Sequence, residues 1–288
     1  MIGRGKGTGT TLGVGERRIG RISVGVLAWV VGVIWIFPVA WTVLTSFKTE
    51  QDASAQTLHN GLTVARYSDV SHSTTGTLSL SAAFTNSLVV VVVSTVIVML
   101  LALPAAYALA IRPVPKWRDV LFFFISTKFL PIVASIFPIY VYAQKWNLIG
   151  TRTILIVLYI AINLPLAIWM MRSFFVEVPR ELIEASEIDG TSLFNQLRSV
   201  ILPIAAPGIA ATALLCVIFA WNEYFYAIQL NFAGASTMPQ WVIGNVSTRG
   251  NFLAKLSAAS IIACLPVVLA GWAAQKRMIR GLSMGAIK

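Results

Sequence analysis

Carboxylate side chains gather in one polar segment of the chain, residues 172–199, which lies between two long apolar runs. They are Glu177, Glu181, Glu184, Glu187 and Asp189. Three of the glutamates follow one another at intervals of three residues, so on a helix they form a loose stripe along one side. Such a stripe is suited to binding a basic partner surface, although an acidic hairpin that contacts only water would have the same composition.

The same segment predicts a helix, a corner and a second helix. Pro179 suits the first turn of a helix over residues 180–188, and acidic residues near its N-terminus interact favourably with the helix dipole. Gly190 is expected to end this helix, because glycine readily adopts the left-handed conformation found there. The threonine or serine that comes next can cap a second helix over residues 193–200. We therefore expect a bent helical hairpin that carries negative charge.

The sequence on either side of this hairpin has the composition of a membrane protein. Of its 288 residues, 57% are hydrophobic and 11% are charged, whereas an ordinary soluble domain has about 25% charged residues. So few charges cannot cover a water-facing surface of this size. The net charge of +11 is interpreted as Lys and Arg beside the membrane rather than as a nucleic-acid site, because the sequence lacks RNA-binding aromatic patterns and finger spacing.

Six apolar runs are long enough to cross a bilayer, since one crossing needs about 20 mostly apolar residues. They cover residues 22–44, 82–111, 120–142, 153–171, about 200 to beyond 221, and 256–275. Lys128 interrupts the third run. The sequence thus predicts an all-α integral membrane protein of six transmembrane helices.

The predicted transmembrane domain covers residues 22–276. It includes an outer polar loop and the acidic cytoplasmic loop, and a short tail flanks it on each side. These parts are the basic tail 1–21, the outer loop 47–81, the cytoplasmic loop 172–199 and the C-terminal tail 277–288. The first apolar run is too long for a signal-peptide core and lacks a small-residue cleavage site, so we expect it to remain as a helix.

The distribution of Lys and Arg predicts the orientation of the chain. With a cytoplasmic N-terminus, 15 of the 22 Lys and Arg residues lie on the cytoplasmic side, 6 lie outside, and Lys128 lies within a span. The positive-inside rule then places both termini and the acidic hairpin in the cytoplasm.

No residue pattern in the sequence indicates catalysis or a metal site. Both histidines, His59 and His72, lie in the outer loop, and both cysteines, Cys216 and Cys264, lie within apolar runs. A zinc site would need more ligands at tighter spacing. Lys6 stands among glycines, but neither Ser nor Thr follows it directly, as a phosphate-binding loop requires. We therefore expect no enzyme activity, no metal and no cofactor in this chain.

The acidic hairpin resembles a known sequence pattern, the EAA loop of binding-protein-dependent ABC importer permeases. That pattern is Glu-Ala-Ala, three residues, Gly, nine residues, and then Ile-x-Leu-Pro. The matching residues are Glu184-Ala185-Ser186-Glu187-Ile188-Asp189-Gly190-Thr191, Phe194, Ile201-Leu202-Pro203 and Pro207. Two small departures are Ser186 in place of the second Ala, and Ile201 directly before Leu202.

The resemblance implies a type I ABC importer permease fold, also called MetI-like, in which this loop docks into a cleft of a cytoplasmic ATPase. Glu184 would pair with a basic ATPase residue, Ala185 and Ser186 would allow close approach, and Gly190 would set the corner. The implied docking residues are Glu181, Glu184, Ala185, Ser186, Glu187, Asp189 and Gly190. The chain has no Walker A motif, so ATP and Mg²⁺ would bind to the partner.

Other segments resemble the MalG-like carbohydrate permeases within this family. They are residues 126–131, Trp221-Asn222-Glu223-Tyr224 and the C-terminal residues 275–288. Residues 47–50 and 251–260 look most like the polyol branch.

Four polar residues within or beside the apolar runs are candidates for the sugar pathway. A charge near the bilayer centre costs about 2.5–3.5 kcal/mol, so Lys128 should face protein or water. Asn222, Glu223 and Tyr224 supply the hydrogen-bonding groups and the aromatic face that sugar sites combine. Two alternatives remain, in which Lys128 pairs with a carbonyl or an acid and Glu223 lies at the membrane interface.

The resemblance as a whole implies one permease subunit of a bacterial inner-membrane importer for a sugar or sugar alcohol. Its implied partners are a second, MalF-like permease, an ATPase dimer, an extracytoplasmic substrate-binding protein and the lipid bilayer. The alternatives are an ABC permease for another small solute such as an amino acid, and an ion-coupled secondary transporter or channel. A membrane enzyme is disfavoured, because it would need a catalytic cluster at membrane depth.

Overall fold

The computed structural model describes residues 14–57, 61–72, 74–75, 78–112, 114–231, 234–244 and 252–285. The glycine-rich part of the basic tail, residues 1–13, lies outside the described residues, and so does His59.

Five long helices form most of the molecule. They are α1 (Val14–Ser46), α4 (Leu80–Ile111), α7 (Arg152–Val176), α10 (Leu202–Trp221) and α13 (Leu253–Gly285). Shorter helices connect them: α2 (Glu50–Ser54), α3 (Ala65–His72), α5 (Trp117–Ser126), α6 (Ile132–Lys145), α8 (Arg180–Ile188), α9 (Leu193–Gln196), α11 (Phe225–Leu230) and α12 (Met238–Gly244). A 3-10 turn, η1 (Thr127–Phe129), follows α5, and a π-helical turn, η2 (Leu197–Ile201), follows α9.

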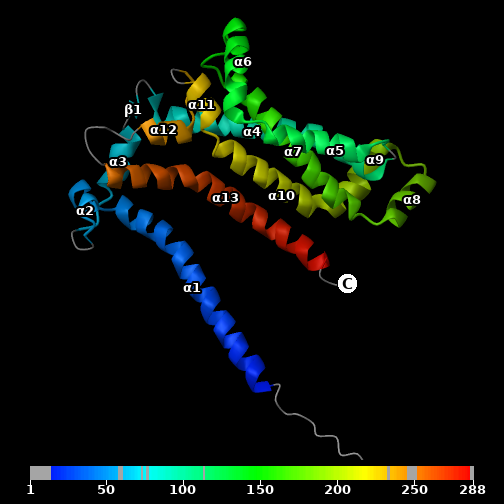
Figure 1. The fold of residues 1–288 in the computed structure, drawn as a ribbon, viewed down its shortest axis with the longest axis horizontal. Helices are drawn as coiled ribbons and strands as arrows, with labels where there is room; N and C mark the ends of the chain where they lie inside the picture. The colour runs from blue at the N-terminus through cyan, green and yellow to red at the C-terminus, as the bar shows by residue number, and fades with distance from the viewer. Residues whose placement is uncertain are drawn as a thin grey trace, which may run out of the picture.

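The long helices α4, α7, α10 and α13 run side by side, whereas α1 contacts α13 and diverges from it along its length (Figure 1). Helices α8 and α9 lie at one end of this bundle, and α2, α3, α11 and α12 lie at the other. The outer loop also holds two two-residue strands, β1 (Thr74–Thr75) and β2 (Leu78–Ser79), paired antiparallel. This small hairpin is the one addition to the predicted all-α class within the described residues.

Five segments are long and apolar enough to cross a membrane. They are Val24–Ser46, Leu80–Ile111, Arg152–Val176, Leu193–Trp221 and Leu253–Gln275. The predicted third span is not one straight helix, because α5 with η1 and α6 are bent by 87° relative to each other. Pro131 explains the break: it has no N–H to donate, and it holds the preceding Leu130 in an extended conformation (ψ 124°). The count reaches six only if this bent pair is one span.

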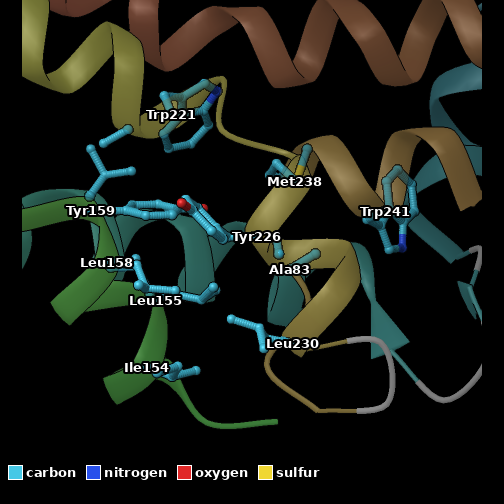
Figure 2. Packing of buried hydrophobic residues seen from close by; sticks show 14 of the residues in the cluster. Ala83, Ile154, Leu155, Leu158, Tyr159, Trp221, Tyr226, Leu230, Met238 and Trp241 are labelled. Carbon is cyan, nitrogen blue, oxygen red and sulfur yellow. The ribbon is translucent and has the colours of Figure 1, made fainter. Parts of the chain in front are cut away.

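Two clusters of buried side chains hold the bundle together. The outer cluster centres on Tyr159 of α7, Trp221 of α10, Tyr226 of α11 and Trp241 of α12, and Figure 2 shows Tyr159, Tyr226 and Trp221 close to one another. The inner cluster joins α4, α7 and α10 to the acidic hairpin. Its largest members include Met171, Phe175, Ile168, Ile201 and Tyr107.

A carboxylate of α2 caps the start of α13 at the end of the molecule that also holds α3 and α12 (Figure 1). Glu50 accepts hydrogen bonds from the backbone N–H groups of Ala254 (3.1 Å) and Lys255 (2.9 Å). A negative charge here satisfies free N–H donors and interacts favourably with the helix dipole. The two segments that resemble the polyol branch are therefore in contact with each other, and this contact gives them a structural role.

Candidate functional site

The acidic hairpin forms at one end of the bundle with the predicted corner (Figure 1). Helix α8 begins directly after Pro179, and Gly190 follows it with a φ of +66°, in the left-handed region that favours glycine. Ser192 caps the second helix, because its side chain accepts a hydrogen bond from the N–H of Asn195 (3.4 Å). The predicted helix, corner and second helix are confirmed.

The second helix runs on into α10 as predicted, within the single apolar segment Leu193–Trp221, but residues 197–201 are π-helical. Helix α9 ends at Gln196, and the wider π turn η2 then leads into α10. Pro203 lies at the start of α10. Since a proline ring has no N–H and clashes with the carbonyl four residues before it, a wider turn here is physically reasonable.

Most of the predicted docking residues lie on the exposed side of α8 and at the corner. Glu181, Glu184, Ala185, Asp189 and Gly190 are exposed. Glu187 is exposed as well, but its carboxylate forms an ion pair with Arg112 after α4 (3.3 Å). Within the described residues, no ion pair joins Glu181, Glu184 or Asp189 to another side chain, so these three carboxylates face outward.

Ser186 does not lie on the expected docking surface. Its side chain is only 7% exposed and points to the inside of the hairpin, where it accepts a hydrogen bond from Gln196 (2.7 Å). With Ile183, it forms the buried side of α8. Each residue of an α-helix is rotated by about 100° from the one before it. Ser186 comes two residues after Glu184 and therefore lies on the opposite side of the helix.

Apolar side chains at the corner form a feature that the charge pattern did not predict. Ile188 is 86% exposed, Phe194 is 68% exposed, and Leu193 is also exposed. We call these three residues the hairpin tip. Their signal in the sequence is the presence of bulky apolar residues on both sides of a corner glycine in a polar segment. Because apolar surface in water is unfavourable, a tip of this kind favours a covered state.

The base of the hairpin is packed firmly against the inner cluster. Val178, Ile183 and Ile201 are buried there. Arg172 of α7 donates a hydrogen bond from Nε to the carbonyl of Leu109 (3.1 Å), and its guanidinium lies 3.7 Å from the centre of the Trp117 ring. The hairpin thus has an exposed tip and a base that is continuous with the bundle.

Glu223 lies two residues beyond the apolar span that ends at Trp221. One carboxylate oxygen accepts a hydrogen bond from the N–H of Tyr226 (2.9 Å), and the other is buried without a partner among the described residues. Tyr159 donates to the backbone carbonyl of Glu223 (3.3 Å). Burial raises the pKa of the Glu223 carboxyl above its ordinary value, because loss of water disfavours the charged form, and the Tyr226 N–H opposes this shift.

The other candidate pathway residues are placed differently. Asn222 is exposed and donates to the carbonyl of Ile218 in its own helix (2.8 Å), and Tyr224 is half-buried. Lys128 is exposed, and its Nζ donates to the carbonyl of Ile162 in α7 (2.6 Å). This is the carbonyl pairing that the sequence left open as the structural alternative. Within the described residues, no hydrogen bond or ion pair joins Lys128 to residues 222–224.

The described residues contain no group of three or more His, Cys, Asp and Glu side chains that could hold a metal ion. The two described cysteines, Cys216 and Cys264, are free thiols.

Comparisons with known proteins place this geometry among transport proteins. Residues 76–281 match the family described as the inner membrane component of binding-protein-dependent transport systems. A sulfoquinovosyl glycerol transport system permease protein from Agrobacterium fabrum is 31% identical over 88% of this chain and 89% of its own length. A trehalose transport system permease protein from Mycobacterium tuberculosis is 32% identical over 72% of this chain and 77% of its own length.

The fold also matches a solved structure. This structure is a bacterial ABC transporter involved in the import of the acidic polysaccharide alginate, with a TM-score of 0.73 and 21% identity. The match covers 93% of this chain and 99% of the other. At this identity the match shows the fold alone, which is that of an ABC importer permease.

Proposed function

The chain belongs to the family of inner membrane components of binding-protein-dependent transport systems, and from that premise we propose that it is one permease subunit of an importer for a sugar or sugar alcohol. Members of this family are membrane-spanning subunits without catalytic residues, and a separate ATPase hydrolyses ATP. The secondary-transporter alternative therefore falls.

The observation that carries the proposal is the hairpin at one end of the bundle. An apolar tip beside three outward-facing carboxylates has the composition of an interface centre with a charged rim. The tip would lose water on docking, and the carboxylates of Glu181, Glu184 and Asp189 would favour a basic partner surface. We assign the ATPase as that partner. ATP and Mg²⁺ bind to the ATPase dimer rather than to this chain.

The arrangement of the ends supports a cytoplasmic location for the hairpin and both termini. The hairpin, the start of α1 and the end of α13 lie toward the same end of the molecule (Figure 1). The loops and tails assigned to this side of the membrane carry more Lys and Arg than those assigned to the other side, which is typical of the cytoplasmic side. A second permease subunit completes the pore, and an external binding protein delivers substrate at the end that holds α2, α3 and α12.

A carbohydrate substrate agrees with the relatives, whose names include trehalose and sulfoquinovosyl glycerol. Asn222, Glu223 and Tyr224 at the outer end of α10 remain our candidates for the pathway. Lys128 is the weaker candidate, because its charged group is hydrogen-bonded to α7. The sugar-alcohol alternative rests on residues 47–50 and 251–260, of which the Glu50 contact explains a part.

The test is an ATPase assay on the assembled complex in proteoliposomes with its binding protein. Trehalose, maltose, sorbitol and methionine serve as probes. We expect the chain to co-purify with an ATPase and expect a sugar or sorbitol to stimulate ATP hydrolysis. Stimulation by methionine alone would favour the amino-acid alternative. Absence of any associated ATPase would contradict the proposal.

A further inference from the structure

A buried polar network connects the hairpin to α4. The hydroxyl of Tyr107, near the inner end of α4, donates a hydrogen bond to Oε1 of Gln196 in α9 (2.6 Å). The Nε2 of Gln196 donates to the Ser186 hydroxyl (2.7 Å) and to the carbonyl of Ile183 (3.2 Å), both in α8. Ser186 in turn donates to the Ile183 carbonyl (2.7 Å). One side chain therefore joins three helices.

Both polar atoms of the Gln196 side chain have hydrogen-bond partners within the network. Gln196 is 1% exposed, and its amide uses its oxygen once and its nitrogen twice. Because the Ile183 carbonyl can only accept, the amide nitrogen must face α8, and the oxygen must then face Tyr107. Buried amides are retained when each polar atom has a partner, since an unsatisfied one is costly. The geometry thus fixes the position of α9 relative to α4 and α8.

Ser186 is also the residue that departs from the Glu-Ala-Ala pattern. An alanine at this position could not accept the hydrogen bond from Gln196 or donate to Ile183. Ser186 therefore bonds to Gln196, which lies ten residues later in the chain. Gln196 also bonds to Tyr107 in α4. The three side chains act as a unit.

The network matters because the covalent connections of the hairpin are few. The chain enters α8 through residues 177–179 and leaves α9 through the π turn η2. Val178 and Ile201 in these connections pack with side chains of α4 in the inner cluster, but apolar packing is not directional. The ion pair between Arg112 and Glu187 also joins the hairpin to the end of α4, but both side chains are over one-third exposed, and exposed pairs contribute little. The buried network is the stronger attachment.

We propose that Gln196 is a positioning residue that fixes the acidic hairpin to α4 through Ser186 and Tyr107, so that α4 moves with the hairpin when the ATPase closes. This inference rests on the proposed function. It assigns a route from the ATPase interface into the helix that packs most extensively against α7.

Spin labels test the attachment without any transport substrate. Labels are placed at the exposed positions Lys116, after α4, and Asn195, in α9, with Cys216 and Cys264 replaced by alanine. In the assembled complex we expect a narrow distance distribution both without nucleotide and with ATP. Gln196→Met should broaden it in both states. A distribution as narrow as that of the parent in both states would overturn the proposal.

Coupling is the second readout, measured as uptake per ATP hydrolysed with trehalose, maltose and sorbitol as probes. Tyr107→Phe removes one hydroxyl, and we expect uptake per ATP to fall about fivefold, the effect of one buried hydrogen bond. ATPase binding should be retained. The matched control is Asn195→Ala, an exposed change in α9 directly before Gln196, which should leave the ratio unchanged.

A triple variant separates positioning from a purely structural role. Tyr107→Phe, Ser186→Ala and Gln196→Met together remove the network without leaving an unsatisfied side-chain group. We expect thermal stability to recover relative to Gln196→Met alone, while uptake per ATP stays low. Recovery of both would show that the network serves stability only. If the parent complex itself shows no ATPase association, the proposed function fails and the positioning role falls with it.

Discussion

At the scale of single residues, the two sides of α8 have different tasks. Glu181 and Glu184 face outward without partners in the described residues, whereas Ile183 and Ser186 are buried against the base of the hairpin. A substitution on the outward side should therefore change association with the ATPase and leave folding intact. A substitution on the inward side should change both.

We predict that Glu184→Lys weakens binding of the ATPase about tenfold, which corresponds to about 1.4 kcal/mol. The change places a positive charge where a basic partner surface is expected. Because the site is exposed, thermal stability should stay within about 0.5 kcal/mol. The measurement is the affinity of the purified ATPase for the permease in detergent.

The matched control for that variant is Glu177→Lys, which reverses an exposed charge in the same loop but outside α8. It should bind the ATPase with parental affinity. Equal effects of the two variants would indicate a general charge effect and would count against a specific role for Glu184.

The two residues that follow α10, Asn222 and Glu223, allow an effect on uptake to be separated from an effect on stability. We predict that Asn222→Ala lowers substrate uptake with unchanged thermal stability, because this exposed amide donates, among the described residues, only to the carbonyl of Ile218 one turn before it. Glu223→Ala should lower both, since it removes the acceptor for the Tyr226 N–H and costs about 1 kcal/mol. Uptake assays and thermal unfolding check the pair. Parental uptake by both variants would remove these residues from the pathway.

At the scale of elements, capping determines where the last long helix begins. We predict that Glu50→Ala lowers the free energy of unfolding by about 1 kcal/mol, because two N–H groups at the start of α13 lose their acceptor. Gln51→Ala changes an exposed neighbour in α2 and should have little effect. Chemical denaturation in detergent measures both. Equal stability of the two variants would show that the cap contributes nothing.

The elements differ in how far the sequence predicts them. The long apolar runs predicted the five long helices, because the length and the hydrophobicity needed to cross a bilayer are both visible in the chain. Pro179, Gly190 and Ser192 predicted the hairpin through purely local chemistry. In contrast, the contact of Glu50 with α13 joins residues about 200 positions apart, and no local pattern contains it.

In the candidate site too, local sequence predicts some features, whereas others depend on residues far apart in the chain. The spacing of the glutamates predicted the outward face of α8. The inward position of Ser186 depends on Gln196 and on Tyr107, which lies 89 residues from Gln196 in the chain. The third run was read as one span because hydropathy does not report a bend, although Pro131 was present as a signal for it.

At the scale of the whole molecule, the bundle places two different surfaces at its ends. At the end that holds α2, α3 and α12, hydrogen bonds connect Arg152 to Asn86 and Asn86 to the backbone carbonyl of Ser236. The end that holds α8 and α9 presents an exposed apolar tip on a buried base. Helix α1 leaves its apolar side chains exposed along the described part, as expected for contact with lipid or a second subunit. We therefore expect the ATPase to cover the end that holds the hairpin tip.

Photo-crosslinking in intact membranes measures whether the hairpin tip contacts the ATPase. A photoreactive phenylalanine analogue replaces Phe194 in the tip, and in a separate control it replaces Phe137, which is 76% exposed. Phe137 belongs to α6, a helix that lies away from α8 and α9 (Figure 1). We predict a crosslink from position 194 to the ATPase and none from position 137. A complex that transports its substrate but gives no ATPase crosslink from position 194, or gives one from position 137 alone, would contradict the account.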